Sequence, residues 1–270
     1  ALAATDARSA DGGAGIGVVG SLGARVRGPA AERLGHDALP DTDGMTTPDP
    51  PVLHRAFRTM ADAGVRTVAM EVTSHALAQR RVDGLRYALG VVTNLVPDEH
   101  LDFHKTPEEY LRVKVRFFDH LEPRAPIVLD AEDPLVREKV AAFLARDLDH
   151  AVVGVSLGEL APALHEGAAP DPDAAVCVEN LRWDAGGATF GLRVRRPIPR
   201  LRALRGATPD ADEVLAPCVV PVVLPMLGVQ QVANAALAAT AALVAGASEA
   251  GITEALAELE PIRRRMEVVR

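Results

Sequence analysis

The chain has 270 residues, 48% of them hydrophobic and only 3% aromatic, so it can bury a large core of small and branched aliphatic side chains. Its formal net charge is −8 and it has no basic run interleaved with aromatic residues, so we expect no nucleic-acid partner. No uninterrupted apolar run is long enough to cross a bilayer, so we expect no membrane partner. Cys177 and Cys218 lie far apart and are expected to be reduced thiols of a cytoplasmic protein.

Apolar runs alternate with helical patterns over residues 1–156. The apolar runs predict buried strands at 15–20, 67–72, 89–95, 126–130 and 151–156. Helix-start signals, namely Asp49 before two prolines, Thr106 followed by Glu109, and Asp133, predict the intervening helices. Residues 21–46 are rich in Gly, Pro and Asp and are predicted to be a loop. This alternation predicts an α/β fold with a mostly parallel sheet flanked by helices.

Residues 157–228 differ in character from the rest of the chain. Short β-like runs at 175–179, 188–195 and 218–224 are separated by Asp, Gly and Pro, which predicts a small antiparallel β insert. Helical patterning returns later, at 231–245 and 253–259. We therefore expect one domain over residues 1–270, with the insert at about 157–228.

The helix predicted after Thr106, which should end near Leu121, carries a lysine on its apolar face. Tyr110, Lys114, Phe117 and Leu121 have helical spacing and share one side. A charged amine on a core-facing side is costly unless it is paired. Either the Lys114 side chain extends so that its ammonium reaches water, or Lys114 is a functional lysine with altered protonation or a covalent modification.

Polar side chains follow two successive predicted strands. Glu71 ends the strand at 67–72, and Thr93 and Asn94 end the strand at 89–95. Because ligands of open α/β sheets bind beyond the carboxyl ends of strands, we expect both ends to face one crevice. The loop that follows adds Asp98, Glu99, His100, Asp102 and His104. The oxygen ligands favour Mg²⁺, and the imidazoles leave zinc open.

Several motifs occur in a fixed order over residues 15–104, 106–121 and 224–270. The long run is MEVTSHALAQRRVDGLRYALGVVTNLVPDEHLDFHKTPEEYLRVKVRFF; GVVGSLG and TTPDP precede it, and LPMLGVQQVANAALAA and RRRME follow it. These motifs closely resemble those of the Mur ligases, most of all the MurE type, whose pattern is MEVSSHAL-x-Q-x-RV, TNL-x-x-DHLDFHGT and a helix with a lysine. The resemblance implies the P-loop-NTPase-like central domain of such a ligase.

The resemblance also implies roles for individual residues. Lys114 matches the catalytic lysine that the family carbamylates with CO₂, which would convert a cation into a carboxylate-like ligand for Mg²⁺. Glu71 and His100 match the other metal-binding positions, and His100 is also a candidate catalytic residue. Five residues match contacts to the nucleotide-sugar dipeptide, namely Thr46, Thr47, Thr73, Gln79 and Arg81. Three match contacts to ATP, namely Asn94, Asn234 and Arg265.

The implied enzyme is an ATP-dependent acid–amino-acid ligase of peptidoglycan synthesis, with Mg²⁺ as cofactor and ATP as cosubstrate. It would add the third amino acid, L-Lys or meso-diaminopimelate, to UDP-N-acetylmuramoyl-L-alanyl-D-glutamate. The terminal carboxylate would attack the γ-phosphate of ATP, and the amine of the amino acid would then capture the acyl phosphate. Positioning and charge neutralisation carry most of the catalysis in such phosphoryl transfer.

The sequence departs from the family pattern in several places. The phosphate loop, G-x-x-G-x-x-GKT/S, would come before residue 15 and is not present in the chain. We expect it to precede residue 1, the family's first and third domains to lie outside the chain as well, and the isolated chain to be inactive. The loop at 93–104 has one extra residue, so Asp98 or Glu99 replaces the usual aspartate. Gln231 replaces an asparagine, and Arg263 and Arg264 replace Pro-Gly.

Three other functions compete with this interpretation. One is a related ligase of the same superfamily, of the folylpolyglutamate or poly-amino-acid synthetase type. Another is a non-catalytic binding module, which the missing phosphate loop would permit. The third is a metal-dependent hydrolase, whose zinc content after purification would distinguish it. Its ligands would be Glu71, His75, His100, Asp102 and His104.

Overall fold

The computed structural model describes residues 15–34, 38–96, 98, 100–146, 149–201 and 214–259. The chain divides into two compact units. Among the described residues, unit 1 comprises 88–95 and those from 122 onward, and unit 2 comprises those up to 87 and 96–121. The α/β architecture predicted from the sequence is confirmed in both units.

Unit 1 is built on a six-stranded sheet in the order β11-β8-β7-β6-β5-β4. Its strands β4 to β7 are parallel, and β7, β8 and β11 are antiparallel to one another in turn. All four residues of β5 are buried, as expected for a parallel strand covered on both faces. The strands are β4 (Gly90–Val92), β5 (Ile127–Asp130), β6 (Val152–Ser156), β7 (Val176–Asp184), β8 (Gly187–Val194) and β11 (Cys218–Leu224).

The predicted antiparallel insert is part of this main sheet. Val155 pairs with Val176 and Ser156 with Cys177, so the first residues of β7 extend the parallel sheet. Val176, Cys177 and Val178 are all buried, whereas the rest of β7 is half-buried or exposed. The antiparallel pairing was therefore predicted correctly, but the separation from the parallel sheet was not. A two-stranded pair, β9 (Ile198–Pro199) with β10 (Val214–Leu215), lies apart from it.

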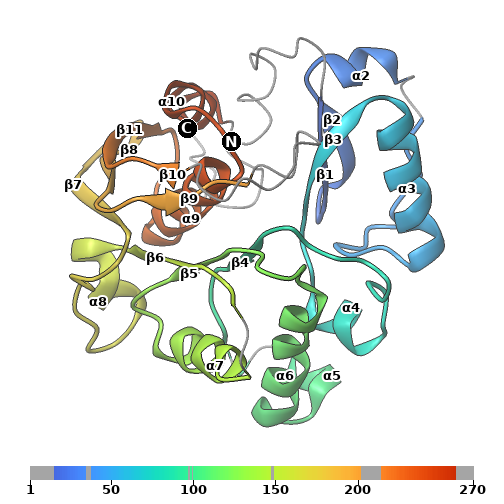
Figure 1. Cartoon of the computed structure of the whole chain (residues 1–270), viewed down its shortest axis with the longest axis horizontal. Helices are drawn as coiled ribbons and strands as arrows, with labels where there is room; N and C mark the ends of the chain where they lie inside the picture. The colour runs from blue at the N-terminus through green and yellow to red at the C-terminus, as the bar shows by residue number, and fades with distance from the viewer. Residues whose placement is uncertain are drawn as a thin grey trace. The chain divides into compact units, whose positions relative to one another are not determined.

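Helices cover the parallel strands of unit 1. Figure 1 shows α9 (Val229–Val244) and α7 (Pro134–Leu144) on opposite sides of β4, β5 and β6. The alanine-rich α9 is buried over most of its surface, because small side chains let it approach the strands closely. α10 (Glu249–Ala257) packs on β11, where the Thr253 hydroxyl donates to the Pro221 carbonyl at 2.8 Å. Shorter elements are η2 (Gly158–Leu160) and α8 (Ala161–Leu164).

Unit 2 contains a separate three-stranded sheet in the order β2-β1-β3. β1 (Gly15–Gly20) is parallel to β3 (Val65–Met70) and antiparallel to β2 (Gly23–Arg27). β2 lies in a segment that was predicted to be a loop. The helices of unit 2 are α2 (Pro29–Arg33), α3 (Pro50–Asp62), α4 (Ser74–Ala78), α5 (Leu101–His104), α6 (Pro107–Lys114) and the 3₁₀ helix η1 (Val115–His120).

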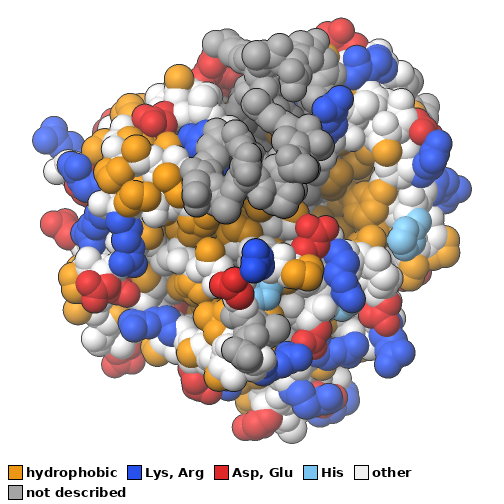
Figure 2. Space-filling model, viewed as in Figure 1, with side chains coloured by type: hydrophobic (Ala, Val, Ile, Leu, Met, Phe, Trp, Pro, Cys, Tyr) orange, Lys and Arg blue, Asp and Glu red, His pale blue; other side chains and the backbone are white. Residues whose placement is uncertain are grey.

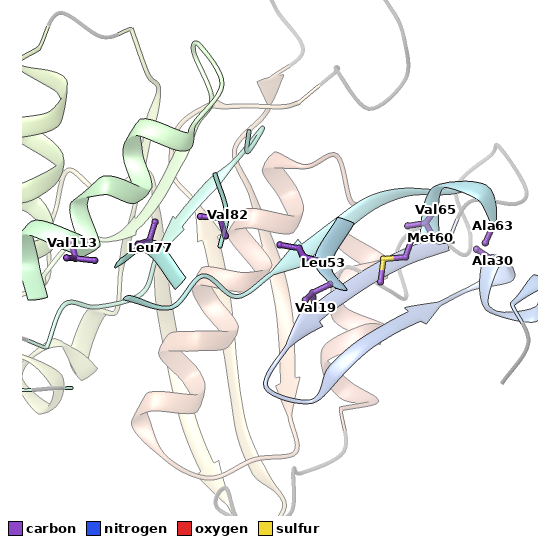
Figure 3. Close-up of a cluster of buried hydrophobic side chains, with 9 residues drawn as sticks. All are labelled: Val19, Ala30, Leu53, Met60, Ala63, Val65, Leu77, Val82 and Val113. Carbon is purple, nitrogen blue, oxygen red and sulfur yellow. The ribbon is translucent and has the colours of Figure 1, made fainter. Parts of the chain in front are cut away.

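The core of unit 2 forms where α3 packs on the sheet. Figure 3 shows Val19 of β1 beside Leu53 and Met60 of α3, and all three side chains are almost fully buried. The helix predicted to start after Asp49 is confirmed, and the chain leaves it through Gly64 at a φ of 86°. This core supports the end of β3, after which Glu71 follows directly.

The predicted long helix after Thr106 is two elements. Its start is confirmed, because the Thr106 hydroxyl accepts a 3.1 Å hydrogen bond from the Glu109 amide. The α-helix ends at Lys114, however, and residues 115–120 continue as a 3₁₀ helix, which is more tightly wound. The α-helical face predicted to include Phe117 and Leu121 therefore ends at Lys114. Lys114 lies at the junction between the α-helix and the 3₁₀ helix.

The surface carries both signs of charge. Among the described residues visible in Figure 2, basic and acidic side chains are interspersed, with no continuous basic area on that face. This distribution agrees with the net charge of −8. No helix in the described ranges is both long and apolar enough to span a membrane.

Candidate active site in unit 2

A buried hydroxyl organises the end of β3. The Thr47 hydroxyl donates to the Glu71 carbonyl oxygen at 2.9 Å and accepts a bond from the Thr73 amide at 3.1 Å. The Thr73 hydroxyl in turn accepts from the Ala76 amide at 3.2 Å and caps α4. Thr47 is only 1% exposed. Two predicted substrate residues, Thr47 and Thr73, therefore use their hydroxyls to shape this strand end.

The carboxylate of Glu71 is exposed directly beyond β3. The Ser21 hydroxyl lies 3.4 Å from each of its two oxygens, which orients the carboxylate without neutralising it. A Cβ atom at Gly20 would come within 2.7 Å of Oε1, so in this conformation the Glu71 side chain lies close against the Gly20 backbone. Glu71 is thus a solvent-accessible carboxylate in a defined position, as a cation ligand requires.

Arg81 fixes the segment that carries Thr46 and Thr47. Its Nη1 donates to the Thr47 carbonyl at 2.9 Å and lies 3.2 Å from the Met45 sulfur. Its Nε forms an ion pair with Asp49 at 3.1 Å. The Arg81 side chain is only 18% exposed, whereas its partner Asp49 is 58% exposed, so solvent reaches the pair from one side. Arg81 therefore holds residues 45–49 in place.

The two remaining predicted substrate residues are more open. Thr46 is half-buried within the segment that Arg81 holds, and Gln79 is exposed at the carboxyl end of α4. Both side chains belong to unit 2, as do Glu71, His100 and Lys114. The predicted sugar-dipeptide and metal positions thus share one folding unit.

A set of packed rings, here called the ring column, runs from α4 to α6. His75 lies 4.8 Å from His100, 4.3 Å from Phe103 and 5.7 Å from His104, measured between ring centroids. His104 continues to Tyr110 at 5.6 Å. Lys114 Nζ lies 5.9 Å above the Tyr110 ring, within the range of a cation–π contact. The column thereby links His100 to Lys114.

Two histidines of the ring column have lowered pKa values. Burial lowers the pKa of His75 from 6.5, and the charges of His100 and His104 lower it further. Burial also lowers the pKa of His104 from 6.5, although the Glu109 carboxylate opposes this shift. His104 is 1% exposed, and its Nε2 has no hydrogen-bond partner among the described residues. A buried imidazole is more stable in the neutral form.

The backbone is strained at both ends of α5. His100 precedes the helix with φ 58° and ψ 31°, the left-handed conformation. Lys105 follows it with φ 66° and ψ −38°, and the Thr106 amide bonds to the His104 carbonyl at 2.8 Å. This is a γ-turn with positive φ, a rare and strained form. The family pattern has glycine at the position of Lys105, where glycine would carry no such strain.

The donor set fits a magnesium ion chemically. Glu71 offers a carboxylate and His100 an imidazole, and carbamylation of Lys114 would add a second carboxylate. This set contains only two side chains of the His, Cys, Asp or Glu type. Over the described residues, no three side chains of those four types are grouped closely enough to hold a metal. The five-ligand hydrolase site considered above therefore has no support in the described structure.

The two predicted ATP residues that the structure describes belong to unit 1. Asn94 is exposed just past β4, and Asn234 is exposed on α9. Arg265 lies outside the described residues, as do Glu99, Arg263 and Arg264, whereas Asp98 is described and exposed. β3 and β4 belong to different sheets. The crevice expected to be shared by Glu71 and Asn94 is therefore not formed by one sheet, and it stays a prediction.

Buried acids at the carboxyl end of β5 were missed by the sequence reasoning. Asp130 accepts from the Glu132 amide at 2.9 Å and lies 2.8 Å from His165 Nε2. Glu132 accepts from the Leu157 and Asp171 amides, both at 2.8 Å. Three acids in LDAED directly after an apolar strand were the available signal. Their hydrogen bonds are to one histidine and to backbone amides, two of which are 25 and 39 positions from Glu132, so these acids bind the loops of unit 1 together.

More than half of the chain matches one family model. Residues 8–167 match the Mur ligase middle domain, which is more than half of the chain, and the chain belongs to that family. A relative from Brucella melitensis, UDP-N-acetylmuramoyl-L-alanyl-D-glutamate--2,6-diaminopimelate ligase, is 32% identical over 230 residues, covering 85% of this chain and 39% of the relative. A ligase of the same name from Mesorhizobium japonicum is 48% identical over 111 residues, 41% of this chain and 23% of the relative.

The fold agrees with this membership. A solved structure of UDP-N-acetylmuramoyl-L-alanyl-D-glutamate--2,6-diaminopimelate ligase superposes with a TM-score of 0.67 at 22% identity, covering 100% of this chain and 45% of that one. The chain thus spans less than half the length of these proteins. The expected middle-domain fold, a mostly parallel sheet flanked by helices, is confirmed.

Proposed function

We propose that the protein containing this chain joins meso-diaminopimelate to UDP-N-acetylmuramoyl-L-alanyl-D-glutamate at the expense of ATP. One observation carries this proposal: the family match over residues 8–167 includes every predicted substrate and metal residue of unit 2. Diaminopimelate is preferred over L-Lys because the similar relatives bear that name. L-Lys remains the second candidate to be tested.

Within this function, Glu71, His100 and carbamylated Lys114 would hold Mg²⁺, which neutralises charge on the phosphates of ATP. The exposed, oriented carboxylate of Glu71 and the ring column between His100 and Lys114 support this proposal. Modification of Lys114 removes a positive charge that would otherwise repel the metal. The site would therefore form only when CO₂ has reacted with the lysine.

The dipeptide's terminal carboxylate would be activated in two balanced steps. One of its oxygens attacks the γ-phosphorus of ATP and ADP leaves; the amine of diaminopimelate then attacks the acyl carbon, and phosphate leaves with loss of a proton. Thr46, Gln79 and Arg81 are proposed to bind the sugar dipeptide, while Thr47 and Thr73 shape the strand end beside it. Asn94, Asn234 and Arg265 are proposed to contact the nucleotide.

The test uses the full natural protein that contains this sequence. ADP release and product mass are measured with the dipeptide, ATP and either diaminopimelate or L-Lys, for the wild type, Glu71→Gln and Lys114→Ala. Loss of a metal ligand removes several kcal/mol of charge stabilisation, so both variants should lose about a hundredfold or more in kcat. Lys139→Ala, on α7, is the matched control and should keep wild-type activity.

The outcomes separate the competing functions. Product formed with L-Lys alone would correct the amino acid while keeping the ligase. ADP release that requires a folate or another carboxylate would identify a different ligase of the superfamily. No nucleotide binding and no ADP release by the wild type would contradict the proposal and favour the non-catalytic module.

A further inference from the structure

The ring of His75 packs against three residues at α5, although the proposed function gives His75 no role. Its ring packs within 4.8 Å of His100, 4.3 Å of Phe103 and 5.7 Å of His104, measured between centroids. These three residues belong to α5 and its first flanking position. One side chain of α4 thus contacts residues at both ends of a four-residue helix.

The segment that His75 contacts has little intrinsic stability. A helix of four residues is too short to be stable by itself. The positive φ angles at His100 and Lys105 add backbone strain at both ends of this helix. Such strain persists only where the surrounding structure compensates for it. The packing of α5 against neighbouring rings is therefore needed to keep His100 in its left-handed conformation.

We propose that His75 is a positioning residue that holds α5 and thereby sets the orientation of the His100 imidazole. This inference rests on the proposed function, in which His100 is a metal ligand. The interaction acts through ring packing: His75 meets His100 edge to face at 84° and Phe103 at a tilt of 40°. A flat aromatic ring at position 75 is thus the required feature.

Two substitutions separate the effect of a planar ring at position 75 from the effect of side-chain volume. His75→Phe keeps a planar ring that can pack on Phe103 and His100. His75→Leu fills similar space with a branched aliphatic chain, so unit 2 should still fold, but it offers no flat face. Positioning groups around metal ligands typically contribute about 10–100-fold to metal affinity. His54→Phe, at an exposed histidine of α3, is the matched control.

The experiment is a titration of the full natural protein with Mn²⁺ as the probe, in bicarbonate, followed by electron paramagnetic resonance. Glu71→Gln identifies the binding that belongs to the proposed site. We expect His75→Leu to weaken that binding about tenfold or more, and His75→Phe and His54→Phe to remain within about twofold of the wild type. Circular dichroism at the same temperature verifies that each variant is folded.

Two different failures would be visible. If the wild type binds Mn²⁺ through Glu71 and His75→Leu binds equally well, or if His75→Phe is weakened as much as His75→Leu, the ring-positioning role is overturned while the metal site stands. If the wild type shows no binding that depends on Glu71, the proposed magnesium site fails, and the role of His75 fails with it.

Discussion

The hydroxyl of Thr47 donates a 2.9 Å hydrogen bond to the carbonyl oxygen of Glu71, although the two residues are 24 positions apart. The same hydroxyl receives the Thr73 amide at 3.1 Å. The hydroxyl thus supplies hydrogen bonds of the kind that a neighbouring strand would supply to the backbone just past β3. These bonds fix the backbone that presents the Glu71 carboxylate. The threonine pair of the TTPDP motif is therefore partly a structural device.

Replacing Thr47 tests this structural role. Thr47→Val keeps the shape but leaves the Glu71 carbonyl and the Thr73 amide without their partner in a buried place. Each such loss costs about 1–3 kcal/mol, so the free energy of unfolding in urea should fall by that order. Thr47→Ser, which keeps the hydroxyl, should lose less. Equal urea midpoints for wild type and Thr47→Val would contradict the role.

The strained turn after α5 predicts a stabilising substitution. Lys105 occupies a γ-turn with φ 66°, which glycine adopts without a Cβ clash. Lys105→Gly should raise the free energy of unfolding by about 1 kcal/mol, as relief of strain exceeds the added entropy of the unfolded chain. Lys105→Ala removes the same charge but keeps the Cβ, so it should give no gain. A gain in both variants would show that the charge, and not the backbone, is responsible.

The acids after β5 predict a strong and specific loss of stability. Both Glu132 oxygens accept backbone amides at 2.8 Å, and the residue is 6% exposed. Glu132→Gln keeps the shape but turns an NH₂ group toward one of those amides. We expect the free energy of unfolding to fall by about 2–3 kcal/mol. Glu159→Gln, at an exposed position on η2, is the control, and a loss of similar size there would refute the interpretation.

His104 predicts how stability depends on pH. Burial lowers its pKa below 6.5 in the folded protein, an effect that the Glu109 and Asp102 carboxylates oppose and the His100 and Lys114 charges reinforce. Unfolding therefore takes up a proton as the pH falls below 6.5. The contribution of neutral His104 to the free energy of unfolding is fully present above pH 6.5. It is lost as the pH falls toward the pKa of His104 in the folded protein.

Urea unfolding at pH 7.5, 6.5 and 5.5 would measure this dependence. His104→Phe keeps a ring against Tyr110 and removes the titrating group, so stability should decline less on acidification than in the wild type. His75, whose pKa is lowered in the same direction, accounts for part of the remaining slope. An unchanged slope in His104→Phe would contradict the assignment.

Local signals in the sequence predicted much of the fold. The runs at 15–20 and 218–224 are the strands β1 and β11 residue for residue. The caps at Thr106 and Asp133 are confirmed, because both side chains accept hydrogen bonds from following amides. These features depend on neighbours close in sequence or on continuous burial. Such interactions leave a direct pattern in the residue types.

Features set by distant contacts were not predictable in the same way. β2 was missed because its residues Gly23–Arg27 are half-buried or exposed and follow a Gly-rich turn, so their pattern resembles a loop. The division of β3 and β4 between two sheets depends on pairings across long sequence separations. The 3₁₀ turn after Lys114 likewise has no marker in the run VRFFDH.

The candidate site shows the same contrast. Glu71, His100 and Lys114 were found through the motif resemblance, and the structure places them in one unit. The contacts that hold them, from Ser21 to Glu71 and from His75 to α5, join residues that no local pattern relates. Whether these three residues bind Mg²⁺ stays a prediction.

Carbamylation of Lys114 is the central claim, and ¹³C NMR of the full natural protein in ¹³C-bicarbonate at mildly alkaline pH tests it most directly. We predict a carbamate resonance in the wild type that is retained in Lys139→Ala and absent in Lys114→Ala. A wild type without this resonance, or a resonance that survives in Lys114→Ala, would contradict the proposed metal site.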